Sequence, residues 1–212
     1  TYPPLEFAPE PPPVPPLAID DDFELTPVDA APDDAQVNVE QKGDAVAVSD
    51  AAAAGGRHSL RVVDAPGLQH VFDPHVVYTP QYEDGTARCA FDLRVEEGAV
   101  MYHEWRDWSQ PSYLVGPSLW VQQGQLQVHG QTLLEIPAGE FVHFEIAAAL
   151  GADQANSWTL TVTVPGQPPR TFAELAFGSP QFDRLTGVGF ISNADARTVF
   201  YIDNLKLSCA TH

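Results

Sequence analysis

Apolar and polar residues alternate in short runs along most of the chain. In the run TARCAFDLRV, Cys89, Phe91 and Leu93 fall on one face of an extended strand and the charged residues fall on the other. A period of two with many β-branched and aromatic members is typical of half-buried β-strands. The same pattern recurs in residues 22–28, 45–49, 58–64, 75–79, 86–95, 99–105, 118–122, 125–129, 140–150, 157–164, 186–192 and 199–207.

Turn-forming sequences separate these runs. They include EDG, EEG, QQG, HG and PAG, whose glycines suit tight reversals of the chain. Helical periodicity is nearly absent. About a dozen strands at this spacing predict an all-β fold, an antiparallel β-sandwich of the jelly-roll kind. We expect one such domain over residues 20–212, which is long enough to bury a large core.

The first 19 residues have a different composition, with eight prolines in the first sixteen positions. Proline lacks a backbone donor and favours extended polyproline geometry. We therefore expect residues 1–19 to form an extended arm. It would act as a linker or stalk, or it would dock on its own domain or on a neighbouring subunit and so mediate self-association.

The charge balance is strongly acidic, with 10 Lys and Arg against 29 Asp and Glu, a net charge of −19. Such a field repels phosphate backbones and anionic membrane surfaces, so nucleic acid is not an expected partner. No apolar run approaches the roughly 18 residues that a membrane span needs, so membrane insertion is not expected either. The chain opens without an initiator Met, and we expect a processed protein that is secreted or exposed on the cell surface.

Strand parity places both cysteines with the apolar residues. Cys89 shares a face with Phe91 and Leu93, and Cys209 shares a face with Leu205 and Leu207. In an oxidising compartment the two could form a disulfide bridge between the last strand and a central strand. The alternative is two separate buried thiols.

An aromatic and charged strip occupies residues 99–121. Parity places Met101, His103 and Trp105 on the core face of the predicted strand, and Tyr102, Glu104 and Arg106 on the outer face. Sugar rings stack on aromatic rings and offer hydroxyls to carboxylate and guanidinium groups. Core packing is the competing explanation for any single tryptophan, since large sandwiches bury several. The expected carbohydrate contacts, some of them in or beside the following loop, are Tyr102, Glu104, Arg106, Trp108, Tyr113 and Trp120.

The order of several segments resembles that of galactose-binding-like and concanavalin-like jelly rolls. In particular it resembles the xylan- and glucan-binding modules attached to secreted bacterial polysaccharide-degrading enzymes. Residues 99–121 do not match these modules closely. The segments that carry the resemblance are DDFEL (21–25), GGRHSLRVVD (55–64), GTARCAFDLRVEEGA (85–99), IPAGEFVHFEIAAAL (136–150) and FYIDNLKLS (200–208).

The resemblance implies a structural Ca²⁺ where the first and last strands meet. By position, its ligands would be Glu24 and Asp203. Calcium prefers hard oxygen ligands, and one carboxylate from each terminal strand would close the sandwich. The alternative is that these are ordinary solvated carboxylates.

A catalytic set is harder to find. Glu104 with Glu145 or Asp92 would supply two carboxylates, but the E-x-D-x-x-E strand of laminarinase-like jelly rolls is absent. So are the RxEhR, QIH and YFKxG strands of alginate-lyase jelly rolls. The loop with His70, Asp73 and His75 has metal-binding residue types at irregular spacing, and we expect it to pack as a bulged loop against the aromatic strip.

These observations favour a secreted, non-catalytic carbohydrate-binding module. The alternative from another class is a structural subunit of an extracellular fibre or surface assembly, with the arm docked on a neighbouring subunit and covering an open sheet edge. A third hypothesis is a polysaccharide lyase or a glycoside hydrolase.

Overall fold

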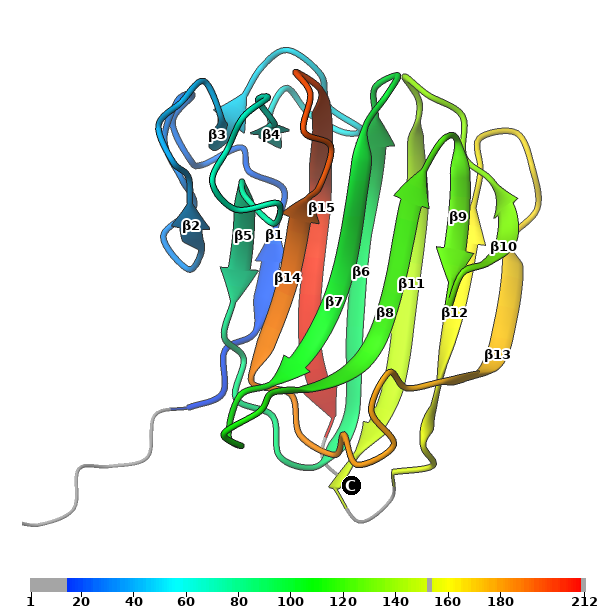
Figure 1. Cartoon of the computed structure of the whole chain (residues 1–212). Coiled ribbons are helices and arrows are strands. Elements are labelled where there is room, and N and C mark those ends of the chain that lie inside the picture. The colour runs from blue at the N-terminus through cyan, green and yellow to red at the C-terminus, as the bar shows by residue number, and fades with distance from the viewer. Residues whose placement is uncertain (1–14, 152–153, 211–212) are drawn as a thin grey trace, which may run out of the picture.

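Two antiparallel β-sheets lie face to face in the computed structural model, which describes residues 15–151 and 154–210 (Figure 1). This confirms the all-β sandwich. The first sheet, sheet A, has the order β13 (Arg170–Ala176), β12 (Ser157–Thr163), β11 (Phe141–Leu150), β6 (Gly85–Val95), β15 (Val199–Ala210), β4 (Ser59–Val63) and β3 (Ala45–Ser49), and the short β1 (Ile19–Asp21) also pairs with β15.

The second sheet, sheet B, lies in front of sheet A in Figure 1. The alternating runs at 75–79, 99–105, 118–122, 125–129 and 186–192 predicted five of its strands, whereas the strands at 36–38 and 131–135 were not predicted. Its order is β10 (Gln131–Glu135), β9 (Gln125–Val128), β8 (Leu114–Gln122), β7 (Val100–Asp107), β14 (Gly187–Ser192), β5 (His75–Tyr78) and β2 (Gln36–Asn38).

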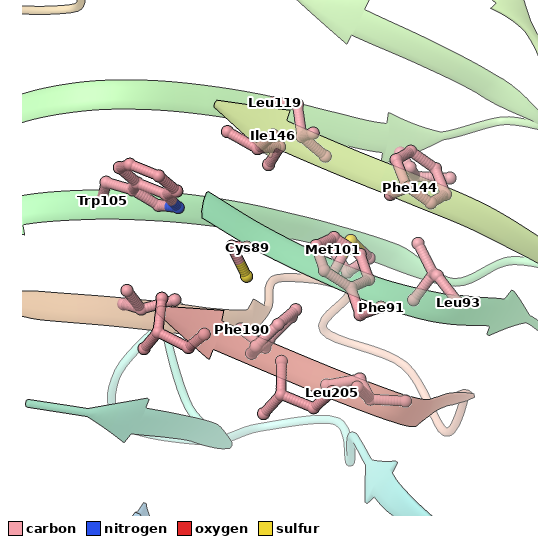
Figure 2. Close-up of a cluster of buried hydrophobic side chains, with 14 of the residues drawn as sticks. Cys89, Phe91, Leu93, Met101, Trp105, Leu119, Phe144, Ile146, Phe190 and Leu205 are labelled. Carbon is pink, nitrogen blue, oxygen red and sulfur yellow. The ribbon is translucent and has the colours of Figure 1, made fainter. Parts of the chain in front are cut away.

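The core fills the space between the sheets with alternate residues of each strand. Phe91 of β6 stacks on Phe144 of β11, with ring centroids 5.2 Å apart, and meets Phe190 of β14 edge-on at 4.9 Å. Figure 2 shows these rings with Met101 and Trp105 in one cluster. Burial of each such side chain stabilises the fold by about 1.5–3 kcal/mol. The predicted parity of β7 is confirmed, because its Met101 face is the core face.

The two cysteines are separate thiols, so the disulfide prediction is corrected. In the β6–β15 register, Cys89 lies opposite Leu207 and Cys209 lies opposite Ala87, so the cysteines are diagonal neighbours and not a directly opposed pair. The Cys209 thiol instead donates to the Asp84 carbonyl at 3.1 Å. Burial raises the pKa of both thiols. They are separate thiols, as the alternative interpretation has it, although only Cys89 is fully buried and Cys209 is partly buried.

The carboxylates expected to bind calcium both hold the loop before β4. Glu24 Oε1 accepts hydrogen bonds from the backbone N–H groups of Arg57 and His58, at 2.6 and 2.7 Å. Asp203 Oδ2 accepts from Ala54 N at 2.7 Å. Within residues 15–151 and 154–210, no group of three or more His, Cys, Asp or Glu side chains is arranged to hold a metal ion. Both carboxylates thus bind backbone N–H groups, and the calcium site stays a prediction.

The described end of the Pro-rich arm lies on its own domain. Leu17 N donates to the Pro80 carbonyl at 3.1 Å, and the Leu17 carbonyl accepts a hydrogen bond from the Tyr82 hydroxyl. Residues 1–14, which carry most of the predicted arm, lie outside the described residues, so self-association through the arm is untested. In the part of the chain that the structure describes, no helix is long and apolar enough to cross a membrane.

Candidate functional site

The outer face of sheet B carries the aromatic and charged strip. Tyr102 on β7 lies opposite Ile191 on β14 on one side and opposite Trp120 on β8 on the other. The row continues to His75 on β5 and to Gln127 on β9. Because side chains alternate between faces of a strand, these five residues all point away from the core. The strip is therefore a continuous row across five strands.

An aromatic pair forms the centre of this row. The rings of Tyr102 and Trp120 stack with centroids 4.5 Å apart and an interplanar angle of 20°. Trp120 lies within β8, in the run 118–122 that the alternating pattern predicted, and it packs on Tyr102. Tyr102 is 9% exposed and burial raises the pKa of its hydroxyl, so it stays protonated at neutral pH. The pair is thus an uncharged aromatic platform.

An ion pair lies beside this platform. Arg106 Nε donates to Glu104 Oε1 at 2.6 Å, and the Ser118 hydroxyl donates to Glu104 Oε2 at 3.3 Å. The guanidinium carbon of Arg106 lies 4.7 Å from the centroid of the Tyr113 ring. Burial opposes the charge of Arg106, but the hydrogen bond and the negative charge of Glu104 outweigh burial and raise its pKa. The pair therefore adds donors and acceptors to the face and no net charge.

Trp108 and Tyr113 come from the segment between β7 and β8. They are 40% and 50% exposed, so they are among the most exposed large apolar side chains of the described residues. The Trp108 ring lies over Gly187, where a Cβ atom would come within 2.3 Å of it. Gly187, on β14, lies opposite Arg106, on β7, so the Trp108 ring also covers the outer face of sheet B. All six predicted contact residues thus belong to one surface.

A cavity of about 260 Å³ opens on this surface, and the aromatic strip alone did not predict all of its walls. Ile191 forms its floor between the neighbouring strands. Phe72 and His75 come from the segment with the irregular His and Asp spacing, which was expected to pack against the strip and does so. The residues lining the cavity are Phe72, His75, Tyr102, Arg106, Tyr113 and Ile191.

The imidazole of His75 is held in one orientation. Its Nδ1 lies 2.9 Å from Asp73 Oδ1 and 2.9 Å from the Phe72 carbonyl oxygen. A carbonyl oxygen only accepts hydrogen bonds, so Nδ1 carries the proton and donates. Nε2 is then the unprotonated nitrogen of the neutral ring, and no hydrogen bond joins it to another described residue. The metal-binding interpretation of His70, Asp73 and His75 finds no support, since these residues form no metal group.

Amide side chains extend the face toward the sheet edge. Gln122 Nε2 donates to Gln127 Oε1 at 2.8 Å, and Gln127 Nε2 donates to Gln125 Oε1 at 3.2 Å. The Thr132 hydroxyl donates to the same Gln125 oxygen at 3.0 Å. Each amide keeps further donor or acceptor capacity that a hydroxylated ligand could use. The sequence analysis missed these glutamines, although Gln125 and Gln127 lie two residues apart on β9 and therefore share one face.

Other cavities lack this combination of groups. One of about 300 Å³ lies on the outer face of sheet A over Ala90 and Ala147, with Arg88, Glu145 and Lys206 around it, and no aromatic ring lines it. A wider one of about 530 Å³ lies beside Asp107 and is lined by polar side chains, Pro111 and Leu114. Only the face of sheet B, among these three, pairs aromatic rings with fixed hydrogen-bonding groups.

The comparisons with known proteins identify the fold. No protein-family model matches the chain, and no curated protein does. An endo-β-1,4-glucuronan lyase from the fungus Trichoderma reesei superposes with a TM-score of 0.61 and 12% identity, over 92% of this chain and 95% of that one. The cellulose-induced protein Cip1 superposes with a TM-score of 0.61 and 18% identity, over 91% of this chain and 97% of that one. The alginate lyase Aly36B superposes with a TM-score of 0.58 and 10% identity, over 94% of this chain and 100% of that one. At these identities the likeness establishes a shared sandwich fold.

Proposed function

We propose that the outer face of sheet B binds a polysaccharide or another glycan. The observation that carries the proposal is the stacked pair of Tyr102 and Trp120, set between the Glu104–Arg106 ion pair and the ladder of glutamines. Aromatic rings pack on the C–H faces of sugars, and fixed amide, carboxylate and guanidinium groups bind their hydroxyls. The names of the similar structures, which include polysaccharide lyases, support a carbohydrate ligand.

The dimensions of the row suit a chain of sugars better than a single ring. From His75 on β5 to Gln127 on β9 the row crosses four strand spacings, or about 19 Å. Exposed rings at Trp108 and Tyr113 lie beside this row. A linear glycan could therefore lie across the strands and contact several aromatic groups at once.

The proposal is tested by measuring binding to a panel of soluble polysaccharides by affinity electrophoresis and by calorimetric titration. Trp120→Ala and Tyr113→Ala are each expected to weaken binding about tenfold, because one aromatic contact contributes about 1.5 kcal/mol. Leu25→Ala is the matched control, since Leu25 is 97% exposed and lies outside the face. Unchanged binding in both aromatic variants, or no binding of any glycan by the native protein, would contradict the proposal.

We also propose that the protein works outside the cytoplasm, at the cell surface or in the medium, where polysaccharides are met. The acidic composition, with a net charge of −19, supports a well-solvated surface there. Fractionation of the producing cells, followed by immunodetection in medium, envelope and cytoplasm, tests this location. Detection in the cytoplasm alone would contradict it.

A further inference from the structure

The cavity on the outer face of sheet B contains the parts of a general-base site. Asp73 is 8% exposed and accepts from Nδ1 of His75, and the Phe72 carbonyl shares that proton. A histidine oriented in this way by a carboxylate presents an unprotonated Nε2 in its neutral form. His75 lines the cavity, and Nε2 is the ring nitrogen that its hydrogen bonds to Asp73 and Phe72 leave unused.

Apolar side chains form the floor and one wall of the cavity next to His75. Ile191 lies between His75 and Tyr102 in the strand register, so the two polar residues stand about 10 Å apart with an aliphatic floor between them. The exposed ring of Phe72 adds a second apolar wall beside His75. This combination suits a small apolar substituent of a sugar, held next to the base.

Donors for a developing negative charge lie across the cavity from the base. Arg106 is fixed by Glu104 through Nε, which leaves its terminal N–H groups free of that contact, and Tyr113 covers its guanidinium face. The hydroxyl of Tyr102 is kept protonated. Fixed donors opposite a base are the arrangement that stabilises the oxyanion of an acyl-transfer intermediate.

We infer that this cavity hydrolyses a small ester, of the acetyl class, carried by an otherwise uncharged polysaccharide. The inference rests on the proposed function of the same face. His75 Nε2 takes a proton from a water molecule, whose oxygen bonds to the carbonyl carbon of the ester. The resulting oxyanion accepts hydrogen bonds from Arg106 and Tyr102. The C–O bond to the sugar then breaks, the protonated His75 gives its proton to the sugar oxygen, and the carboxylic acid leaves.

The charges favour an ester over a polyuronate substrate. Glu104 balances the charge of Arg106 within the site, and the chain as a whole carries a net charge of −19. A polyuronate would approach this face against repulsion and would find no unpaired cation among the cavity residues. A neutral ester is not repelled by the negative charge of the protein and needs no unpaired cation. The carboxylate product, in contrast, is repelled by that charge, which favours its release.

The test is release of acetate from acetylated xylan and acetylated mannan, compared with glycan binding by the same proteins. The native protein is expected to release acetate, and His75→Ala is expected to lower the rate by about a hundredfold or more. Binding of the deacetylated glycan by His75→Ala should weaken far less than the rate falls, because His75 is one contact among several in the row, and added imidazole should restore part of the rate. Asp73→Asn should lower the rate less than His75→Ala does. His129→Ala is the histidine control, since His129 lies at a turn where its Nε2 contacts the Ala176 carbonyl.

Each alternative result has a distinct meaning. Glycan binding without acetate release by the native protein would overturn this inference and leave the binding function intact. Equal rates in the native protein and in His75→Ala, or no rescue by imidazole, would also overturn it. So would an unsaturated uronate product from a polyuronate in place of acetate. If His75→Ala does not fold, His75→Gln provides the same comparison with a larger neutral side chain.

Discussion

His103 makes the stability of this sandwich depend on pH in a way that can be calculated. Its side chain is 0% exposed and lies between the rings of Phe91 and Phe190, at centroid distances of 4.9 and 4.5 Å. Its Nε2 accepts a hydrogen bond from Trp105 Nε1 at 3.0 Å, so the ring is neutral. Burial lowers the pKa of His103 from 6.5 to about 3.

The sign and size follow from this difference. The unfolded chain takes a proton at His103 near pH 6.5, whereas the folded chain resists it until about pH 3. The stabilising contribution is therefore fully present above pH 6.5 and is lost as the pH falls through this window. Each fall of one pH unit in that window lowers the free energy of unfolding by about 1.4 kcal/mol. The total decrease between about pH 7 and about pH 4 is therefore roughly 3 kcal/mol.

The measurement is denaturant unfolding of the native protein and of His103→Gln at both pH values. Glutamine does not titrate, and its amide oxygen can still accept from the Trp105 indole. Other titrating groups are common to both proteins and cancel in the comparison. The native protein should lose roughly 3 kcal/mol more than His103→Gln on acidification. Parallel loss in both proteins would refute the reasoning, because it would show that His103 is not kept neutral by burial.

Three further predictions concern the core, the thiols and sheet A. Phe91→Ala should cost about 3–5 kcal/mol of unfolding free energy by chemical denaturation, because it leaves a cavity against Phe144, and a cost below about 1 kcal/mol would contradict this packing. A thiol reagent should label Cys209 in the folded protein and Cys89 only after unfolding, and a protein with no reactive thiol would restore the disulfide interpretation. Hydrogen bonds to Asp92 and Glu145 raise the pKa of His143. Protonated His143 should therefore stabilise the fold at low pH, and this stabilisation should be lost as the pH rises through the raised pKa. The free energy of unfolding of His143→Gln should accordingly change less than that of the native protein from about pH 6 to about pH 8.

The sequence predicted the architecture because the sheet pattern is local. Alternation in residues 86–95 and 99–105 revealed both the strands and their buried faces, and the parity argument correctly separated Trp105 from Arg106. The run at 118–122 placed Trp120 in a strand, but the start of β8 at Leu114 was not predicted, because PSYLVGPSLW contains two prolines and a glycine that obscure the alternation. The full extent of β8 depends on its pairing with β7, which the local sequence does not encode.

The site was predicted in part, for a similar reason. The six aromatic and charged residues were found because they cluster in one segment. Ile191 and His75 reach the same cavity only through the β5–β14–β7 pairing, which joins positions more than eighty residues apart. The disulfide prediction used facing alone, and facing is the same for directly opposed and diagonal residues. Only the register of Cys89 against Leu207 separates the two cases.

The position of β15 has a consequence for how the domain is made. This strand lies inside sheet A, between β6 and β4, although it comes last in the order of the strands along the chain. Until residues 199–210 have been synthesised, β6 and β4 each lack a neighbour and two rows of backbone groups stay unsatisfied. Sheet A therefore cannot be completed until the last strand has been synthesised. During that time the exposed edges of β6 and β4 must be protected from aggregation.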